Sequence, residues 1–403
     1  MADSRLGRRL RTAVLAMLAA YAQEAVGAAW QFQPVLQLSG TADDNPRLRS
    51  AGADTEVAWE AVAGLTAQRV SEVFEVRAAA SLGYTAYSGS DMPEDEDAQI
   101  LQLETAWRSD RSIWRTGAEY HRDTTLMDVV ALQEVQDPGG DIDVALVEEN
   151  IRRERLLLTT SFRHALTERF DGLLRYDGTY LDYGGGDGGA LRDSWTHRLE
   201  GRGIYRVSER TEAGLGVEAM RFRPSGSGGD IDSVSLMASA THWVSELSSI
   251  GLMVGGWRAE ASGGNGWDDD ETGFLARLSG RTRGELWSAT LTLERSLRPS
   301  GEGVLREADQ LMVRVSRRIS PRLQVLLFGR AYDLRAVATA DDRADRRYWE
   351  VEPRVEWLLS PAWSIGAFYR YRSVDRNAGW GSADSNAVTL TLEYRPPMEA
   401  GRL

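Results

Sequence analysis

The chain has 403 residues, of which 42% are apolar and 27% are charged, and it contains no Cys, so disulfides and thiolate metal sites are excluded. The basic residues are all Arg, and the formal charge of -13 argues against a nucleic-acid binder, which needs a basic surface. Beyond the first thirty residues no apolar run reaches the ~18 to 20 residues of a membrane-spanning helix.

The first 28 residues have the pattern of a secretory signal peptide. Four Arg precede a short apolar stretch at residues 12–22, and Val26, Gly27 and Ala28 precede a predicted cleavage site before Ala29. The apolar stretch is too short for a membrane anchor. We therefore expect residues 1–28 to be removed and the mature chain to work outside the cytoplasm.

From residue 29 onward the chain repeats one unit: a segment, a tight polar turn, a second segment, and a longer loop rich in Gly and Asp, such as residues 262–271 and 377–385. Each segment alternates apolar and polar residues with the period of two that is typical of strands. About eighteen such segments are predicted, an even number that places both chain ends on the same side. They are residues 31–41, 54–67, 72–87, 98–108, 111–122, 150–163, 169–182, 194–206, 211–223, 232–243, 247–260, 272–281, 285–297, 308–318, 322–335, 347–359, 363–374 and 386–395.

Alternation alone does not separate a membrane barrel from a soluble sandwich, because both have one apolar face. The segments are about 10 to 14 residues long, which suits a tilted strand crossing a bilayer and exceeds the usual length of ~5 to 6 residues in globular sheets. Short turns alternate with long loops, as in barrels with periplasmic turns and external loops. Aromatic residues also crowd strand ends on the face taken as apolar, as in an interfacial girdle: Trp107, Trp114, Tyr120, Trp243, Trp257, Trp287, Trp357, Trp363, Tyr369 and Tyr371. The sequence thus predicts an all-β fold, a transmembrane antiparallel up-and-down β-barrel, over residues 29–395.

The polar face of the segments is expected to point into the lumen. A midplane Arg turned toward lipid costs roughly 2 to 4 kcal/mol, so charged faces such as the one carrying Glu350 and Arg354 must turn inward. Pro353 falls on the lipid face and has no N–H for the sheet, and we expect a local bulge there. The predicted pore-lining residues are Arg77, Arg175, Arg198, Arg202, Arg277, Arg314, Arg330, Arg354, Arg370, Arg372, Glu56, Glu60, Glu200, Glu218, Glu352 and Glu356.

Two interpretations of this charged wall stay open. In the first, the charges line a hydrated pore and select a polar or charged solute. In the second, Arg and Glu on neighbouring strands pair with each other and mainly stabilise the wall. A barrel of about eighteen strands is too wide for its side chains to fill, so a channel follows unless a loop plugs it. The long, partly apolar segment 123–149 is the candidate plug, and its alternative is an external loop.

Nothing in the sequence marks an enzyme. His121, His164, His197 and His242 lie in four different segments, and His197 and His242 share the apolar phase, which favours interfacial positions. There is no G-x-S-x-G motif. We therefore expect no catalytic residues, no metal site and no cofactor.

Two motifs carry a family resemblance. The start of the mature chain, WQFQP at residues 30–34 followed by TADDNPRL at residues 41–48, resembles that of outer-membrane β-barrel porins encoded beside exopolysaccharide operons, and so does ENIRRER at residues 149–155. The resemblance implies a role in exporting or handling a surface polysaccharide. One departure is that Tyr394 is followed by further residues, so that residues 396–403 are expected to form a periplasmic C-terminal tail behind an internal insertion signal.

The function that follows is a porin-like conduit in the outer membrane for exopolysaccharide. The alternatives are a structural or adhesion barrel with a closed lumen and a general porin for small solutes. Expected partners are outer-membrane lipid and lipopolysaccharide, with a polysaccharide and periplasmic export proteins implied by the resemblance. We expect no nucleic acid and a monomeric protein.

Overall fold

The computed structural model describes residues 30–88, 96–124, 151–184, 191–226, 229–263, 267–337, 345–376 and 381–400. The predicted signal peptide and residues 125–149 of the predicted plug lie outside these ranges. No helix among the described residues is long and apolar enough to cross a membrane.

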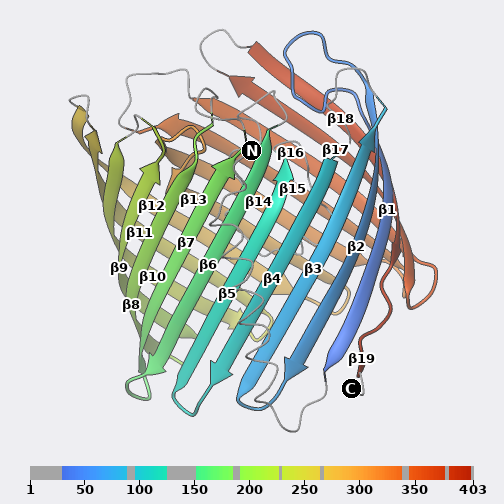
Figure 1. Ribbon diagram of the computed structural model, residues 1–403. Helices are drawn as coiled ribbons and strands as arrows, with labels where there is room; N and C mark the ends of the chain where they lie inside the picture. Colours follow the sequence, from blue (N-terminus) through green and yellow to red (C-terminus); the bar gives the residue numbers. More distant parts are fainter. Residues whose placement is uncertain are drawn as a thin grey trace.

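Eighteen long strands form a closed antiparallel barrel, in which each strand pairs with its neighbours in sequence and β18 pairs with β1 (Figure 1). The predicted fold class and strand number are confirmed. The strands are β1 (Gln31–Asp43), β2 (Glu56–Val70), β3 (Phe74–Tyr87), β4 (Glu96–Arg108), β5 (Ser112–Thr124), β6 (Arg152–Ala165), β7 (Phe170–Tyr183), β8 (Ser194–Ser208), β9 (Thr211–Pro224), β10 (Asp230–Ser245), β11 (Ser248–Gly263), β12 (Trp267–Arg283), β13 (Trp287–Pro299), β14 (Leu305–Arg318), β15 (Leu323–Ala336), β16 (Arg346–Leu358), β17 (Trp363–Arg376) and β18 (Gly381–Tyr394).

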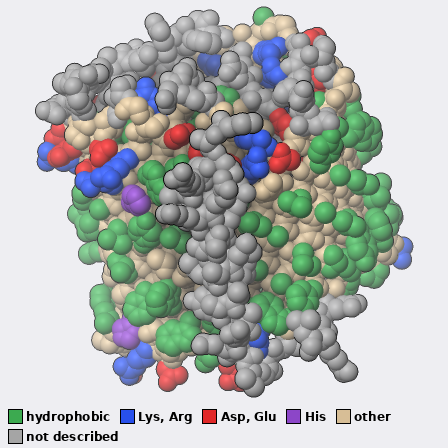
Figure 2. Space-filling view, in the orientation of Figure 1, with side chains coloured by type: hydrophobic (Ala, Val, Ile, Leu, Met, Phe, Trp, Pro, Cys, Tyr) green, Lys and Arg blue, Asp and Glu red, His purple; other side chains and the backbone are tan. Residues whose placement is uncertain are grey.

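The outer face of the wall is apolar over most of its height. In β10, for example, Val234 and Leu236 are exposed, whereas Ser233 and Ser235 between them are buried on the inner side. Figure 2 shows apolar side chains over the middle of the visible wall and charged side chains toward its two ends. An exposed apolar band on a closed barrel is the surface of an outer-membrane protein, so the predicted location is confirmed. The short turns mark the periplasmic end, and the other end is extracellular.

The strands are longer than expected, 13 to 17 residues instead of about 10 to 14. In β9 to β12 and in β18 the strands extend further than predicted at the extracellular end, and in β9 to β12 cross-strand ion pairs on the outer face lie above the apolar band. Arg221 of β9 pairs with Asp232 of β10, and Arg258 of β11 pairs with Asp270 of β12. As a result, most of the predicted loops 262–271 and 377–385 is strand.

Pro353 does not form the expected bulge. It pairs with Leu327 of β15, and only the ladder to β17 is interrupted, between the pairs Val351–Tyr371 and Arg354–Phe368. The register on the two sides of the interruption is the same, so no residue is inserted. The missing N–H of Pro353 therefore removes ladder pairing to β17 without displacing the strand.

The described part of the C-terminal tail continues along β1 beyond the end of β18. The two-residue strand β19 (Glu399–Ala400) pairs with Gln31 and Phe32, and the Gln33 side chain donates to the Pro396 carbonyl oxygen at 2.8 Å. The beginning of β1 therefore has a hydrogen-bonding neighbour on this side as well as β2 on the other.

Candidate functional site: the inner face of the barrel

The strand register places every predicted pore-lining Arg and Glu on the inner face, opposite in phase to the exposed apolar residues of its strand. In β8, for example, Leu199 faces outward between Arg198 and Glu200. In β17, Tyr369 and Tyr371 face outward, whereas Arg370 and Arg372 are buried on the inner side. Because each pleated strand presents one set of side chains to lipid, its charged set borders the enclosed space.

Many of these charges pair with one another, as the second interpretation of the wall expects. Three pairs join adjacent strands: Arg198–Glu218 at 3.4 Å, Arg277–Glu294 at 2.8 Å and Arg330–Glu350 at 3.0 Å. Others join residues two apart on one strand: Arg175–Asp177 at 2.8 Å, Arg202–Glu200 and Arg354–Glu352. Glu60 accepts a hydrogen bond from Ser39 at 3.1 Å. These contacts tie strands together and hold the long side chains against the wall.

A second set of inner arginines has no acidic partner within ion-pair distance among the described residues. Arg77 of β3, Arg115 of β5 and Arg314 of β14 lie in the periplasmic half of their strands. Arg314 instead lies over the Phe328 ring, with 5.9 Å between guanidinium carbon and ring centroid. Arg77 and Arg115 line a cavity of about 440 Å³ together with Glu75, Glu104 and Glu119. The periplasmic half of the lumen therefore presents guanidinium groups that are available to a solute.

The loop between β1 and β2 folds into the barrel at the extracellular end. Leu48 is only 3% exposed and has a positive φ of 50°, and it packs in an apolar cluster on the inner face of β14 to β18 that includes Tyr332, Tyr348 and Val374. Arg376 donates to the Leu48 carbonyl oxygen at 3.0 Å. This loop covers part of the extracellular mouth from inside.

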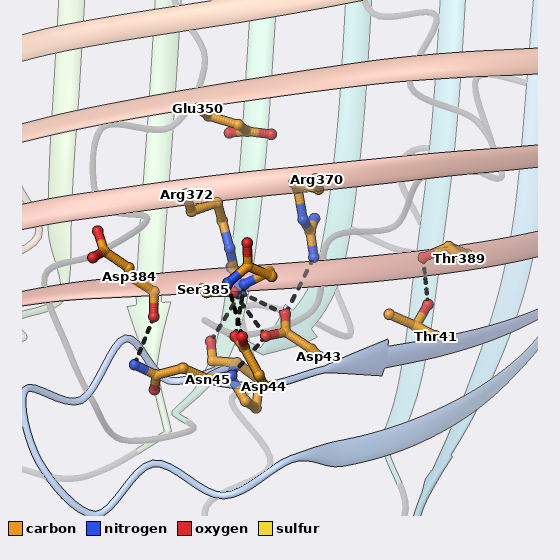
Figure 3. A network of polar contacts seen from close by, with 12 residues as sticks. Thr41, Asp43, Asp44, Asn45, Glu350, Arg370, Arg372, Asp384, Ser385 and Thr389 are labelled. Carbon is orange, nitrogen blue, oxygen red and sulfur yellow. Dashed lines mark hydrogen bonds and ion pairs between the residues drawn. The ribbon is translucent and has the colours of Figure 1, made fainter.

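A buried polar network anchors that loop at the junction of β1 and β18 (Figure 3). Asp43, the last residue of β1, accepts hydrogen bonds from Ser385 Oγ and Arg372 Nη2, both at 2.7 Å, and lies 3.9 Å from Arg370. The Asp43 carboxylate also accepts the backbone N–H of Asn45 at 2.9 Å. One carboxylate therefore holds the closure of the barrel and the start of the inward loop together.

Asn45 continues this network into the loop. Its side-chain amide donates to the carbonyl oxygens of Arg49 and Asp384, both at 2.9 Å, and its oxygen accepts the Arg49 N–H at 2.9 Å. The DDNPRL segment, which the sequence singled out only as a resemblance, thus supplies both the anchor, Asp43 and Asn45, and the inserted apolar residue, Leu48.

A second inward loop, residues 300–304 between β13 and β14, approaches the wall at β8 and β9. Gly301 accepts the backbone N–H of Arg192, just before β8, at 2.7 Å. Gly303 has a positive φ of 82° and packs so closely on Arg192 and Pro224 that a Cβ would clash. Glu302 pairs with Arg306 and with Arg346, the latter at 2.8 Å. Two loops that the sequence did not predict as inward therefore narrow the extracellular mouth.

Two aromatic residues lie on the opposite face from the one predicted. Trp243 is in phase with Thr241 on the inner side of β10, and Trp257 is only 5% exposed. Trp257 belongs to an inner apolar cluster with Phe222 and Leu275. The prediction was wrong because it assigned these residues by type, whereas the phase of exposed neighbours such as Leu252 and Val254 fixes the inward direction at position 257.

The four histidines form no shared site. His121 contacts Glu119 on the inner side at 3.1 Å. His164, His197 and His242 have the same phase as the outward-facing residues of their strands. His164 Nδ1 lies 2.8 Å from Ser112 Oγ, but no described carboxylate contacts that ring as the third member of a hydrolytic triad would. Among the described residues, no group of three or more acidic or histidine side chains is placed to hold a metal ion.

No protein-family model and no curated protein matches the chain. Among solved structures it is similar to OccK2 (OpdF) of Pseudomonas aeruginosa, with 12% identity, a TM-score of 0.49 and coverage of 92% of this chain and 99% of that one. It is also similar to OccAB4 of Acinetobacter baumannii, with 11% identity, a TM-score of 0.48 and coverage of 91% and 98%. The association with exopolysaccharide operons finds no support in these comparisons.

Proposed function

We propose that this protein is a passive outer-membrane channel for small polar solutes, with a preference for anionic ones. The observation that carries the proposal is the inner face itself, which is lined by charged and hydroxyl side chains and bounded by a wall with an apolar exterior. A barrel of this size encloses more space than its side chains fill. Transport through such a lumen is diffusion, and no bond is made or broken.

The expected preference for anions follows from where the inner arginines have carboxylate partners and where they have none. In the extracellular half the carboxylate of Asp43 offsets the charges of Arg370 and Arg372, whereas in the periplasmic half Arg77, Arg115 and Arg314 have no paired carboxylate among the described residues. Guanidinium groups without an ion-pair partner attract anions into the lumen and raise their local concentration. The inward loops at the extracellular mouth favour small solutes over polymers.

Single-channel recording in planar bilayers under a KCl gradient tests the proposal. We expect discrete open steps and a reversal potential that indicates a preference for Cl⁻. Arg314→Glu should shift this potential toward that of a cation-preferring pore. Arg317→Glu is the matched control, because it makes the same change of charge three residues away on the outer face of β14, opposite Trp287.

The other outcomes contradict the proposal in distinct ways. Silence in the bilayer favours a structural barrel with a closed lumen. Open steps that shrink when polysaccharide is added favour the export conduit that the sequence resemblance implies. Equal effects of Arg314→Glu and Arg317→Glu would remove the role of the unpaired inner charges.

A further inference from the structure

The barrel wall divides between β12 and β13 toward the extracellular end. Pairing between these strands ends at Ala276 and Arg295, whereas β12 continues to Trp267 on one side and β13 to Pro299 on the other. Beyond this point β13 pairs only with β14, and both lead into the inward loop 300–304. The inward course of this loop draws the upper end of β13 away from β12.

A hollow of about 680 Å³ lies at this division. Its lining comes from β11 to β16 and is mostly apolar and outward-facing, as at Phe274, Leu293, Leu311, Ala331 and Trp349. Inward-facing residues, among them Arg277, Glu294 and Tyr332, line its lumen side. Phe274, Leu293, Leu311 and Trp349 are exposed, as expected for residues of the lipid-facing band. The hollow is therefore open to the acyl chains of the membrane and not to water alone.

The extracellular side of the hollow carries charged residues at the level where lipid headgroups lie. Arg295 is held by Asp309 and stacks on Phe274, with 4.4 Å between guanidinium carbon and ring centroid. Arg347 is held less tightly than Arg295. Its side chain is 76% exposed, and its Nε lies 3.7 Å from the Asp333 carboxylate. The neighbouring Arg335 is half exposed and reaches Asp333 at 3.4 Å and Asp309 at 3.6 Å.

These two arginines keep most of their N–H donors directed at solvent. A guanidinium has five donors in a planar fork that matches the oxygens of a phosphate, and the contacts of Arg335 and Arg347 use few of them. The carboxylates of Asp309 and Asp333 hold the two side chains in place beside the hollow. An apolar floor below exposed guanidinium groups is complementary to a lipid with acyl chains and a phosphorylated headgroup.

We propose that this hollow, lined by Phe274, Leu293, Leu311, Ala331 and Trp349 and bordered by Arg335 and Arg347, binds a phosphorylated acyl lipid of the outer leaflet. The acyl chains lie on the apolar floor, and a phosphate accepts hydrogen bonds from Arg347 and Arg335. The bound lipid covers the edge of β12 where pairing with β13 ends.

Native mass spectrometry of the purified barrel with bis-phosphorylated lipid A in detergent tests the site. We expect one tightly held lipid A per barrel, and a reduction of its affinity by about tenfold in the double variant R335Q/R347Q, from the loss of charge-assisted hydrogen bonds. A331W should also weaken binding without any change of charge, because the indole fills the floor. Lipid A without phosphates should bind the wild type as weakly as bis-phosphorylated lipid A binds R335Q/R347Q.

The matched control is R221Q/R223Q. This variant removes two outward arginines at the extracellular end of β9, away from the hollow. In the wild type Arg221 pairs with Asp232 and Arg223 pairs with Asp230. Heat-modifiable migration on gels checks that every variant is folded. Equal binding by wild type, R335Q/R347Q and A331W overturns the proposal, as does an equal loss in R221Q/R223Q. Channel conductance is measured separately, so failure of the lipid site leaves the proposed function standing.

Discussion

Replacing Asp43 with Ala is expected to lower the free energy of unfolding by about 3 kcal/mol, because it leaves buried charge without its partner. Asp43 is 5% exposed, and Arg370 and Arg372 beside it are each 8% exposed. The substitution also removes the acceptor for Ser385 and for the N–H of Asn45. Urea unfolding in lipid vesicles, followed by tryptophan fluorescence, measures the effect.

The neighbouring residue provides the control for this prediction. Asp44 is exposed and accepts hydrogen bonds from the backbone and side chain of Asn386, so Asp44→Ala removes surface contacts and should cost about 1 kcal/mol or less. The Asp43 substitution should also free the β1–β2 loop and increase single-channel conductance. Equal stability losses for the two variants would show that the buried network does not hold the closure of the barrel.

An arginine in place of Ala238 is expected to destabilise the barrel by roughly 2 to 4 kcal/mol, the cost of an Arg on the lipid face near the bilayer midplane. Ala238 is exposed on the outer face in the middle of β10, and the next residue, Ser239, faces inward. Ser239→Arg introduces the same side chain into the lumen, where water solvates the charge, and should change stability by well under the cost of the outward Arg. Refolding yields into vesicles compare the two variants, and an equal loss in both would contradict the assigned orientation.

The sequence predicted the wall of the barrel well because the wall depends on local alternation. Once the exposed apolar residues of a strand are known, period two fixes the direction of every other side chain, as for Arg198 beside Leu199. The pairing of β1 with β18, which closes the barrel, keeps the same inward and outward alternation, since Leu38 of β1 faces outward opposite Leu392 of β18. The same local rule gave the inward orientation of the predicted pore-lining Arg and Glu residues.

The inward loops could not be predicted in this way, because they depend on contacts between residues far apart in the chain. Asp43 meets Arg372 and Ser385, which are 329 and 342 residues away, and no local pattern encodes that meeting. The buried position of Leu48 likewise depends on the inner face of β14 to β18. A signal was nevertheless present: an apolar Leu follows Asp, Asn and Pro in an otherwise polar loop, which is typical of a structured loop and not of a solvated one.

The polar face of each strand borders enclosed water, and the apolar face borders lipid. Since the chain has no Cys, single cysteines report on this directly. We expect a charged, membrane-impermeant maleimide to label Ser239→Cys and Thr241→Cys in isolated outer membranes and to leave Ala238→Cys and Ala240→Cys unlabelled. Labelling without alternation, or labelling of the alanine positions alone, would contradict the account.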